Sequence, residues 1–234
     1  MLPALAVLFA TLVLASIYWP RYLRLKRERF IRDHPLPKGL YGKLRQRRPE
    51  LAPRDCALVA RGLRQFFLAY LNSGRKYVAM PSQAADDLWH EFILYTRAYE
   101  DFCRHAFGGF LHHTPAVVLG PEKRDNEGLR RVWWHVCKEE NIDPKRPARL
   151  PLLFALDSKL GIEGGFVYSP DCKKLQPADG SGNGGAVHCG TSFSDSSVDG
   201  CTDGFGDGGS GSDGGADGGG DGGGGCGGGC GGGD

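Results

Sequence analysis

The sequence predicts a mostly α-helical protein with a single N-terminal transmembrane helix, a compact helical domain and a disordered tail rich in glycine and aspartate. Three observations predict this class: an uncharged apolar run opens the chain, apolar residues recur at helical spacing through its middle, and glycine dominates its end. We therefore divide the chain into a membrane anchor (1–20), a basic juxtamembrane segment (21–34), a helical domain (35–178) and the tail (179–234).

The first element is the apolar run from Leu2 to Trp19, which contains no charged residue. About 18 to 20 apolar residues in a helix match the hydrocarbon thickness of a bilayer. A cleaved signal peptide is the alternative, but it would carry basic residues before its apolar core. Here the amino terminus is the only positive charge before that core. The dense basic run follows the core, from Arg21 to Arg32, which favours an anchor with the rest of the chain inside. We expect a single-pass protein of the cell membrane whose bulk is cytoplasmic.

Charge is distributed unevenly along the chain. The formal net charge is +2, but the segment from Asp179 to Asp234 contains nine aspartates and neither lysine nor arginine. The basic residues between Arg21 and Arg48 suit membrane topology and anionic headgroups better than nucleic acid, because few aromatic residues are interleaved and no nucleic-acid motif is present. We expect the membrane and an unidentified protein as partners, and no nucleic acid.

Successive amphipathic helices are predicted in the middle of the chain. The first begins at Pro53, a residue suited to a first helical turn, and ends near Asn72. Ser82 can cap the second helix, and Thr96 can cap a third that closes at the glycine pair 108–109. Two more helices are predicted within 127–143 and 150–162, followed by a short strand at 165–169.

The glycine-rich tail has almost no apolar side chains to bury, so it cannot offset the entropy of ordering its backbone. We expect it to be disordered. The chain has eight cysteines but no C-x-x-C pair, which excludes a zinc ribbon. On the predicted cytoplasmic side, cysteines should be thiols or metal ligands rather than disulfides. Three of them fall within helical patterns, which is typical of buried, inert thiols: Cys56, Cys103 and Cys137.

The segment from Asp86 to Pro115 contains the residues most suited to chemistry. His90-Glu91 begins like the zinc-protease motif H-E-x-x-H, but position 94 is leucine, so that motif is absent. Asp86 precedes His90 by one helical turn and can orient its imidazole. A zinc or iron site could be completed from the following helix and loop. The predicted ligands are Asp86, His90, Cys103, His112 and His113. A hydrogen-bonded histidine cluster in the core is the alternative.

Other candidates have a structural and a functional interpretation. Trp89, Tyr99 and Trp133 could line a ligand groove or belong to the core. No Ser-His-Asp, Cys-His or phosphate-loop signature occurs, so the sequence contains no complete catalytic motif and favours a binding role over an enzyme. A metal-assisted hydrolase with Glu91 or Asp87 as its base is the enzymatic alternative.

The order Asp-x-x-Trp-His, then Leu, Tyr, Cys, Gly and a final His, resembles the glycine-rich domain-containing protein family, known in plants and with shorter bacterial relatives. The residues that carry the resemblance are Asp86, Trp89, His90, Leu94, Tyr99, Cys103, Gly108 or Gly109, and His112 or His113. The likeness covers about 80–115, and the glycine-rich end is shared in character. Thr96 stands where plant members tend to have proline. The resemblance implies no particular activity, because none is established for the family.

The sequence therefore predicts a membrane-anchored, cytoplasmic helical module for binding or scaffolding, with a flexible tail. The alternative is a metal-binding domain, structural or catalytic, centred on Asp86, His90 and His113.

Overall fold

The computed structural model describes residues 2–113, 124–170 and 187–193, and within them the side chains of 2–8, 124–126, 187 and 192 are not described. These ranges contain seven α-helices and two short strands, which confirms the mostly helical class. The chain divides into two units, 1–200 and 201–234, and the second lies outside the described residues. The same holds for the greater part of the predicted tail.

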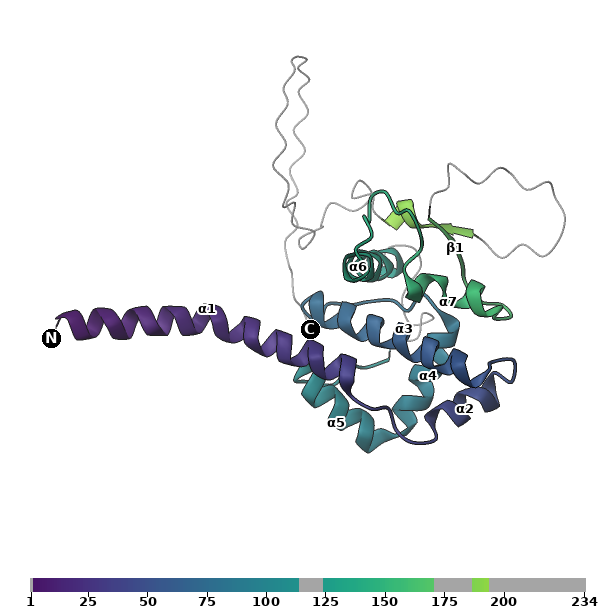
Figure 1. Cartoon of the computed structure of the whole chain (residues 1–234), viewed down its shortest axis with the longest axis horizontal. Helices are drawn as coiled ribbons and strands as arrows, with labels where there is room; N and C mark the ends of the chain where they lie inside the picture. Colours follow the sequence, from purple (N-terminus) through teal and green to yellow (C-terminus); the bar gives the residue numbers. More distant parts are fainter. Residues whose placement is uncertain (1, 114–123, 171–186, 194–234) are drawn as a thin grey trace, which may run out of the picture. The chain divides into compact units, whose positions relative to one another are not determined.

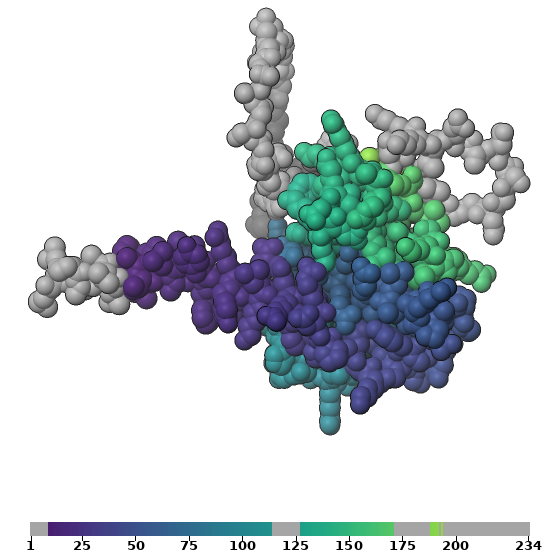
Figure 2. All heavy atoms as spheres, viewed as in Figure 1, coloured from purple at the N-terminus to yellow at the C-terminus, as the bar shows by residue number. Residues whose placement is uncertain are grey.

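The predicted anchor and the basic segment form one continuous helix, α1 (Leu2–Asp33), with Pro20 inside it. The part from Phe9 to Trp19 projects from the rest of the domain (Figure 2), and apolar side chains there are exposed, with Phe9 71% and Trp19 62% accessible. The last turns of α1 pack on α3 and α5, where Ile31 is fully buried. Among the described residues, no helix combines the length and apolar character needed to cross a membrane. The side chains of 2–8, which belong to the predicted anchor, lie outside that description.

Four helices follow α1 before the first gap in the description. They are α2 (Leu40–Arg47), α3 (Pro53–Asn72), α4 (Gln83–Leu94) and α5 (Thr96–Phe107). The predicted start at Pro53 and the cap at Ser82 are confirmed, since the Ser82 hydroxyl accepts from the Ala85 amide at 3.2 Å. Thr96 is the first residue of α5 rather than its cap, because α4 and α5 meet at Tyr95 and leave no separate capping position.

α3 is the central helix of the domain. Figure 1 shows it between α6 and α7 on one side and α2 and α4 on the other, and it packs against all four as well as α1. Its phenylalanines Phe66 and Phe67 are almost fully buried and contact aromatic rings of neighbouring helices. At Gly62 an added Cβ would lie 2.3 Å from Leu156 Cδ1, so α3 and α7 can approach closely only because the residue there is glycine.

The rest of the described chain consists of α6 (Arg124–Glu139), α7 (Leu152–Leu160), β1 (Val167–Ser169), β2 (Val187–Cys189) and the 3-10 turn η3 (Gly190–Phe193). β1 pairs in parallel with β2, with Val167 opposite Val187. The strand predicted at 165–169 is therefore confirmed.

Residues 187–193 correct the predicted boundary of the tail, because they are ordered although they follow its predicted start at 179. The apolar residue of η3, Phe193, is buried against the rings of Trp133, Phe154 and Tyr168, which gives this short stretch a packing partner despite its glycine-rich surroundings. Cys189 is disulfide-bonded. This differs from the expected thiol.

Candidate metal centre

Asp86 and His90 occupy successive turns of α4 and face the same side of it. Nδ1 of His90 lies 2.9 Å from the backbone oxygen of Asp86 and 3.3 Å from its Oδ2. The backbone oxygen of Asp86 is thus the hydrogen-bond partner of the imidazole, and the carboxylate lies beside it at the distance that the Asp-x-x-x-His spacing predicts.

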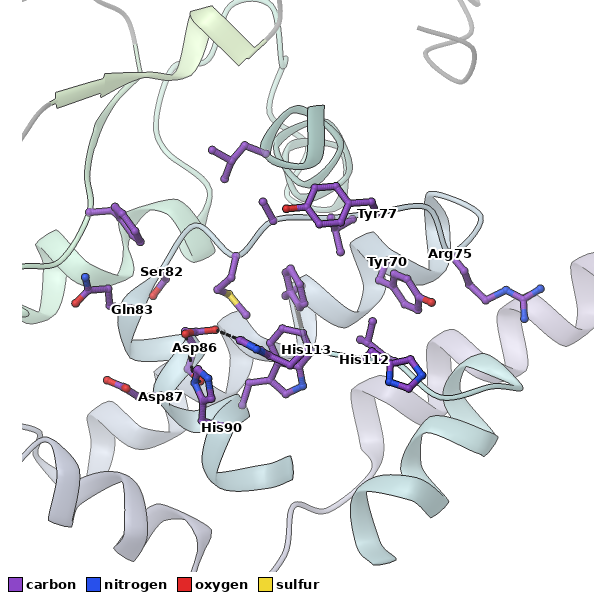
Figure 3. Close-up of a pocket in the computed structure, with 18 of the residues that line it drawn as sticks. Tyr70, Arg75, Tyr77, Ser82, Gln83, Asp86, Asp87, His90, His112 and His113 are labelled. Carbon is purple, nitrogen blue, oxygen red and sulfur yellow. Dashed lines mark hydrogen bonds and ion pairs between the residues drawn. The ribbon is translucent and has the colours of Figure 1, made fainter. Parts of the chain in front are cut away.

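The third member of the cluster comes from the segment that follows α5. Nε2 of His113 lies 3.0 Å from Oδ1 of Asp86, so each carboxylate oxygen faces one imidazole. The two imidazole rings are 4.2 Å apart between centroids. One ligand atom from each of Asp86, His90 and His113 lies within 4.8 Å of the others. Figure 3 shows the three side chains pointing toward one another.

A chain of buried hydrogen bonds holds the segment of His113 against α4. Trp89 Nε1 donates to the Tyr99 hydroxyl at 3.1 Å, and that hydroxyl donates to the backbone oxygen of Leu111 at 2.6 Å. Burial raises the pKa of Tyr99, so the hydroxyl keeps its proton. The His113 ring also packs edge-on against Trp89, at 4.6 Å between centroids. Tyr99 thus positions His113 without contacting it.

The N-terminus of α4 is fixed by a buried carboxylate from α7. Asp157, 2% exposed, accepts hydrogen bonds from the Ser82 hydroxyl (2.7 Å) and from the amides of Gln83 (2.8 Å) and Ala84 (3.2 Å). It also accepts from the Phe166 amide at 3.0 Å. A carboxylate is favoured here because the amides of Gln83 and Ala84, in the first turn of α4, have no partner within the helix. The N-terminal end of the helix dipole is also positive. Asp86 is one turn further along the same helix.

The two other predicted ligands lie apart from the cluster. Cys103 is buried in the core on α5, and burial raises the pKa of its thiol, which disfavours the thiolate that a metal requires. His112 is exposed, its ring centroid lies 4.8 Å from that of Phe110, and it is not part of the cluster found among the described residues.

The acidic residues suggested as hydrolytic bases are held by arginines of α2 and the residue after it. Asp87 contacts Arg47 Nε at 2.8 Å and Arg48 Nε at 2.7 Å, and Glu91 contacts Arg47 Nη1 at 3.6 Å. Both carboxylates are therefore engaged in ion pairs with arginine, which makes them less suited to the role of a hydrolytic base than the sequence alone suggests.

A pocket of about 720 Å³ opens beside the cluster, and Asp86, His90 and His113 form part of its wall (Figure 3). Of the three aromatic residues predicted to line a groove, Trp89 does so. Tyr99 is the buried hydrogen-bonding residue described above. Trp133 is fully buried, and its Nε1 donates to the Pro144 oxygen at 3.1 Å.

Several pocket residues were not singled out in the sequence. They come from α3, the connector before α4, the segment after α5, the residue before β1 and the two strands: Tyr70, Tyr77, Met80, Phe110, Phe166, Tyr168 and His188. Met80 was the nearest signal, because it begins the stretch of about 80–115 that carries the family resemblance.

Fold and site together define a helical domain that carries a two-histidine, one-carboxylate cluster beside an aromatic pocket. A family model described as UCP032817-like matches residues 26–193, and the chain belongs to this UCP032817-like family. The match contains the cluster, Asp157 and both strands, and it begins within the second half of α1. No curated protein and no solved structure was found to match the chain.

Proposed function

We propose that this protein is a membrane-anchored helical module whose domain binds a transition-metal ion, zinc or iron, through Asp86, His90 and His113. The observation that carries the proposal is the convergence of three ligand atoms within 4.8 Å at the wall of a pocket. Two of these ligands come from one helix and the third from a separate segment, so the cluster depends on the tertiary fold.

Partial exposure favours a metal centre over a hydrogen-bonded histidine cluster in the core. The side chains of Asp86, His90 and His113 are 32%, 39% and 17% exposed, whereas a cluster that only stabilised the core would be covered. Three protein ligands with access to a pocket are typical of sites that keep a coordination position open for water or a ligand. Imidazole and carboxylate donors without a thiolate suit zinc and iron(II).

The exposed apolar side chains of α1 between Phe9 and Trp19 support the membrane anchor. Large apolar surfaces left in water mark contacts with a partner or a membrane. Tyr18, Trp19 and Tyr22 are exposed at the point where the apolar run gives way to basic residues, as expected for aromatic side chains at the headgroup level.

The side of the membrane is the sharpest test of the localisation. The basic run after Trp19 favours a cytoplasmic domain, which we propose, whereas the disulfide bond of Cys189 favours an oxidising compartment. A reporter that is active only in the cytoplasm, fused to the C-terminus of the full chain, should be active. Activity confined to an exported reporter would reverse the proposed orientation.

Metal analysis of the purified full chain tests the metal centre directly. We expect about one zinc or iron ion per chain in the wild type and none in His113→Ala, because two ligands do not hold the ion. His188→Ala is the matched control, since His188 lines the same pocket but lies outside the cluster. Metal-free wild type after reconstitution with zinc(II) or iron(II), or equal metal in His113→Ala, would contradict the proposal.

A further inference from the structure

We propose that the pocket beside the cluster binds a planar aromatic molecule that coordinates the metal ion through two adjacent oxygen atoms, as a catechol-type compound does. This inference rests on the proposed metal centre and adds the class of ligand that the centre takes. It is carried by the pocket's size, the chemistry of its walls, two exposed aromatic residues that line it and an unused hydroxyl.

The size of the pocket and the open side of the cluster fit a small organic ligand. The volume of about 720 Å³ lies within the range of roughly 300 to 1,000 Å³ that small-molecule sites occupy. All three protein ligands belong to the pocket wall, so a molecule in the cavity would be able to reach an ion that they hold. Oxygen donors would suit such an ion, and two adjacent oxygens on a ring would offer it two donors from one ligand.

Aromatic walls favour a flat ring over a fatty chain. The residues that line the pocket include the aromatic Phe66, Tyr77, Trp89 and Tyr168, together with Met80. Aromatic rings prefer offset or edge contacts with other rings, and a methionine sulfur makes favourable contacts with ring edges. A slot for an acyl chain would be expected to have mainly aliphatic walls.

Two aromatic residues of the pocket wall are unusually exposed. Phe110 is 47% and Phe166 is 38% exposed, and both belong to the lining of the same pocket although they come from distant parts of the chain. A single exposed phenylalanine is ordinary. Two that line one cavity provide apolar surface that an aromatic ligand would cover.

The Tyr70 hydroxyl offers the ligand a hydrogen bond. Tyr70 lines the pocket, its ring packs edge-on against Phe107 at 5.0 Å, and no partner of its hydroxyl is found among the described residues. Burial raises the pKa of Tyr70, so the hydroxyl remains neutral and can donate to an oxygen of the ligand. Figure 3 shows Tyr70 to one side of the cluster, near His112.

Calorimetric titration of the metal-loaded full chain tests this inference. The probes are 2,3-dihydroxynaphthalene and its dimethyl ether, which has the same rings but cannot bind a metal through anionic oxygens. We expect the diol to bind at least about tenfold more tightly to the metal-loaded protein than to the metal-free protein, because coordination adds to ring packing. The ether should bind equally weakly to both forms. Metal content measured after the titration should be unchanged.

Two variants locate the binding in the pocket. Phe166→Ala should weaken binding of both probes, whereas Tyr41→Ala, at a ring of equal exposure (38%) that does not line the pocket, should leave it unchanged. Tyr70→Phe should weaken the diol by about threefold to tenfold and leave the ether unaffected, as expected for one lost hydrogen bond.

The outcomes separate this inference from the proposed function. If the protein holds metal but binds diol and ether alike, or the diol removes the ion into solution, the ligand class is wrong and the metal centre stands. If Phe166→Ala and Tyr41→Ala affect the diol equally, the ligand is not in this pocket and the inference fails. If the wild type holds no metal, both proposals fail.

Discussion

Two helices of the domain contain the same local arrangement of an aspartate and a histidine, yet only one of them belongs to a candidate site. On α4, Nδ1 of His90 lies 2.9 Å from the backbone oxygen of Asp86 and 3.3 Å from its carboxylate. On α5, the corresponding distances from His105 to Asp101 are 2.8 Å and 3.5 Å. The spacing and the local geometry are therefore nearly identical.

The surroundings of the two pairs differ. Asp86 also meets His113 and faces a pocket, whereas Asp101 is exposed and forms an ion pair with Arg104. The His105 ring packs on Phe30 at 5.4 Å. In both pairs the imidazole hydrogen-bonds to the backbone oxygen one turn earlier, so the Asp-x-x-x-His spacing alone does not distinguish a metal site. Such a pair becomes a metal site only where the fold adds a third ligand and an open cavity.

The largest expected effect is the loss of metal binding when the histidine of one pair, but not of the other, is replaced. His90→Ala should abolish metal binding, and His105→Ala should leave it unchanged. A chelator should lower the melting temperature of the wild type and of His105→Ala but not of His90→Ala, because the free energy of metal binding also stabilises the fold. Calorimetric melting with and without chelator checks this. Equal behaviour of the two variants would remove the distinction between the pairs.

The next prediction tests the Asp157 carboxylate, which holds the first turn of α4. The first turn of α5 has no side-chain cap. Asp157→Asn should lower the free energy of unfolding by about 3 kcal/mol, because it removes a buried negative charge that accepts four hydrogen bonds. Asp143→Asn is the control, since Asp143 is exposed and accepts from the amide of Lys145. Urea unfolding measures both. A loss in Asp157→Asn no larger than in the control would show that α4 needs no support from α7.

Another histidine, His135, extends the comparison because it is partly buried and lies beside cations. Burial, followed by the charges of Arg24, Lys138 and Arg131, lowers the pKa of His135 from 6.5 to about 4. The folded protein keeps this imidazole neutral, whereas the unfolded chain takes up a proton near its ordinary pKa. Stability is therefore unaffected at higher pH. It should fall by about 2 kcal/mol between roughly pH 6.5 and 4, after allowance for partial solvent screening.

Urea unfolding across this pH window, with chelator present, checks the prediction for His135. The chelator is needed because protonation of metal ligands would add its own pH dependence. His135→Gln should flatten the curve below pH 6.5, and His105→Gln should not. An unchanged slope in His135→Gln would mean that another group causes the acid sensitivity.

The smallest expected effect concerns the hydroxyl that holds the third ligand in place. Tyr99→Phe removes the group between Trp89 Nε1 and the Leu111 oxygen, so it should cost about 1 to 2 kcal/mol of stability. It should also weaken metal binding by about tenfold, as observed when support for a ligand is lost. Competition with a chelator of known affinity measures this. Tyr41→Phe, on the surface, should change neither quantity, and a full-strength metal site in Tyr99→Phe would contradict the positioning role.

The sequence was most informative where local signals agree. Pro53 and Ser82 predicted the starts of α3 and α4 correctly, because a proline in a first turn and a hydroxyl cap act within a few residues. α2 was not predicted, since it is short and only Leu40 and Leu44 are buried. β2 and η3 were hidden in glycine-rich sequence, where one buried phenylalanine decides the outcome.

The candidate site was predictable in part. Asp86 and His90 are one turn apart on one helix, so their proximity follows from helical geometry. The sequence-based hypothesis was centred on Asp86, His90 and His113, the residues that the structure brings together, but it also allowed His112 as a ligand, because the direction of adjacent side chains depends on contacts such as that of Tyr99 with Leu111. Cys103 matched the ligand pattern and the apolar stripe of α5 equally well. The pocket wall was not predictable, since its residues come from several separate segments.

The carboxylate of Asp157 also bears on how the protein is made. It follows Ser82 by 75 residues, so α4 leaves the ribosome well before the group that fixes its first turn has been synthesised. Contacts between residues so far apart in sequence form late and slow the folding of a domain. A nascent chain stalled before α7 should therefore present α4 without its buried cap. Completion of the C-terminal part of the domain then becomes the step that orders the histidine cluster during translation.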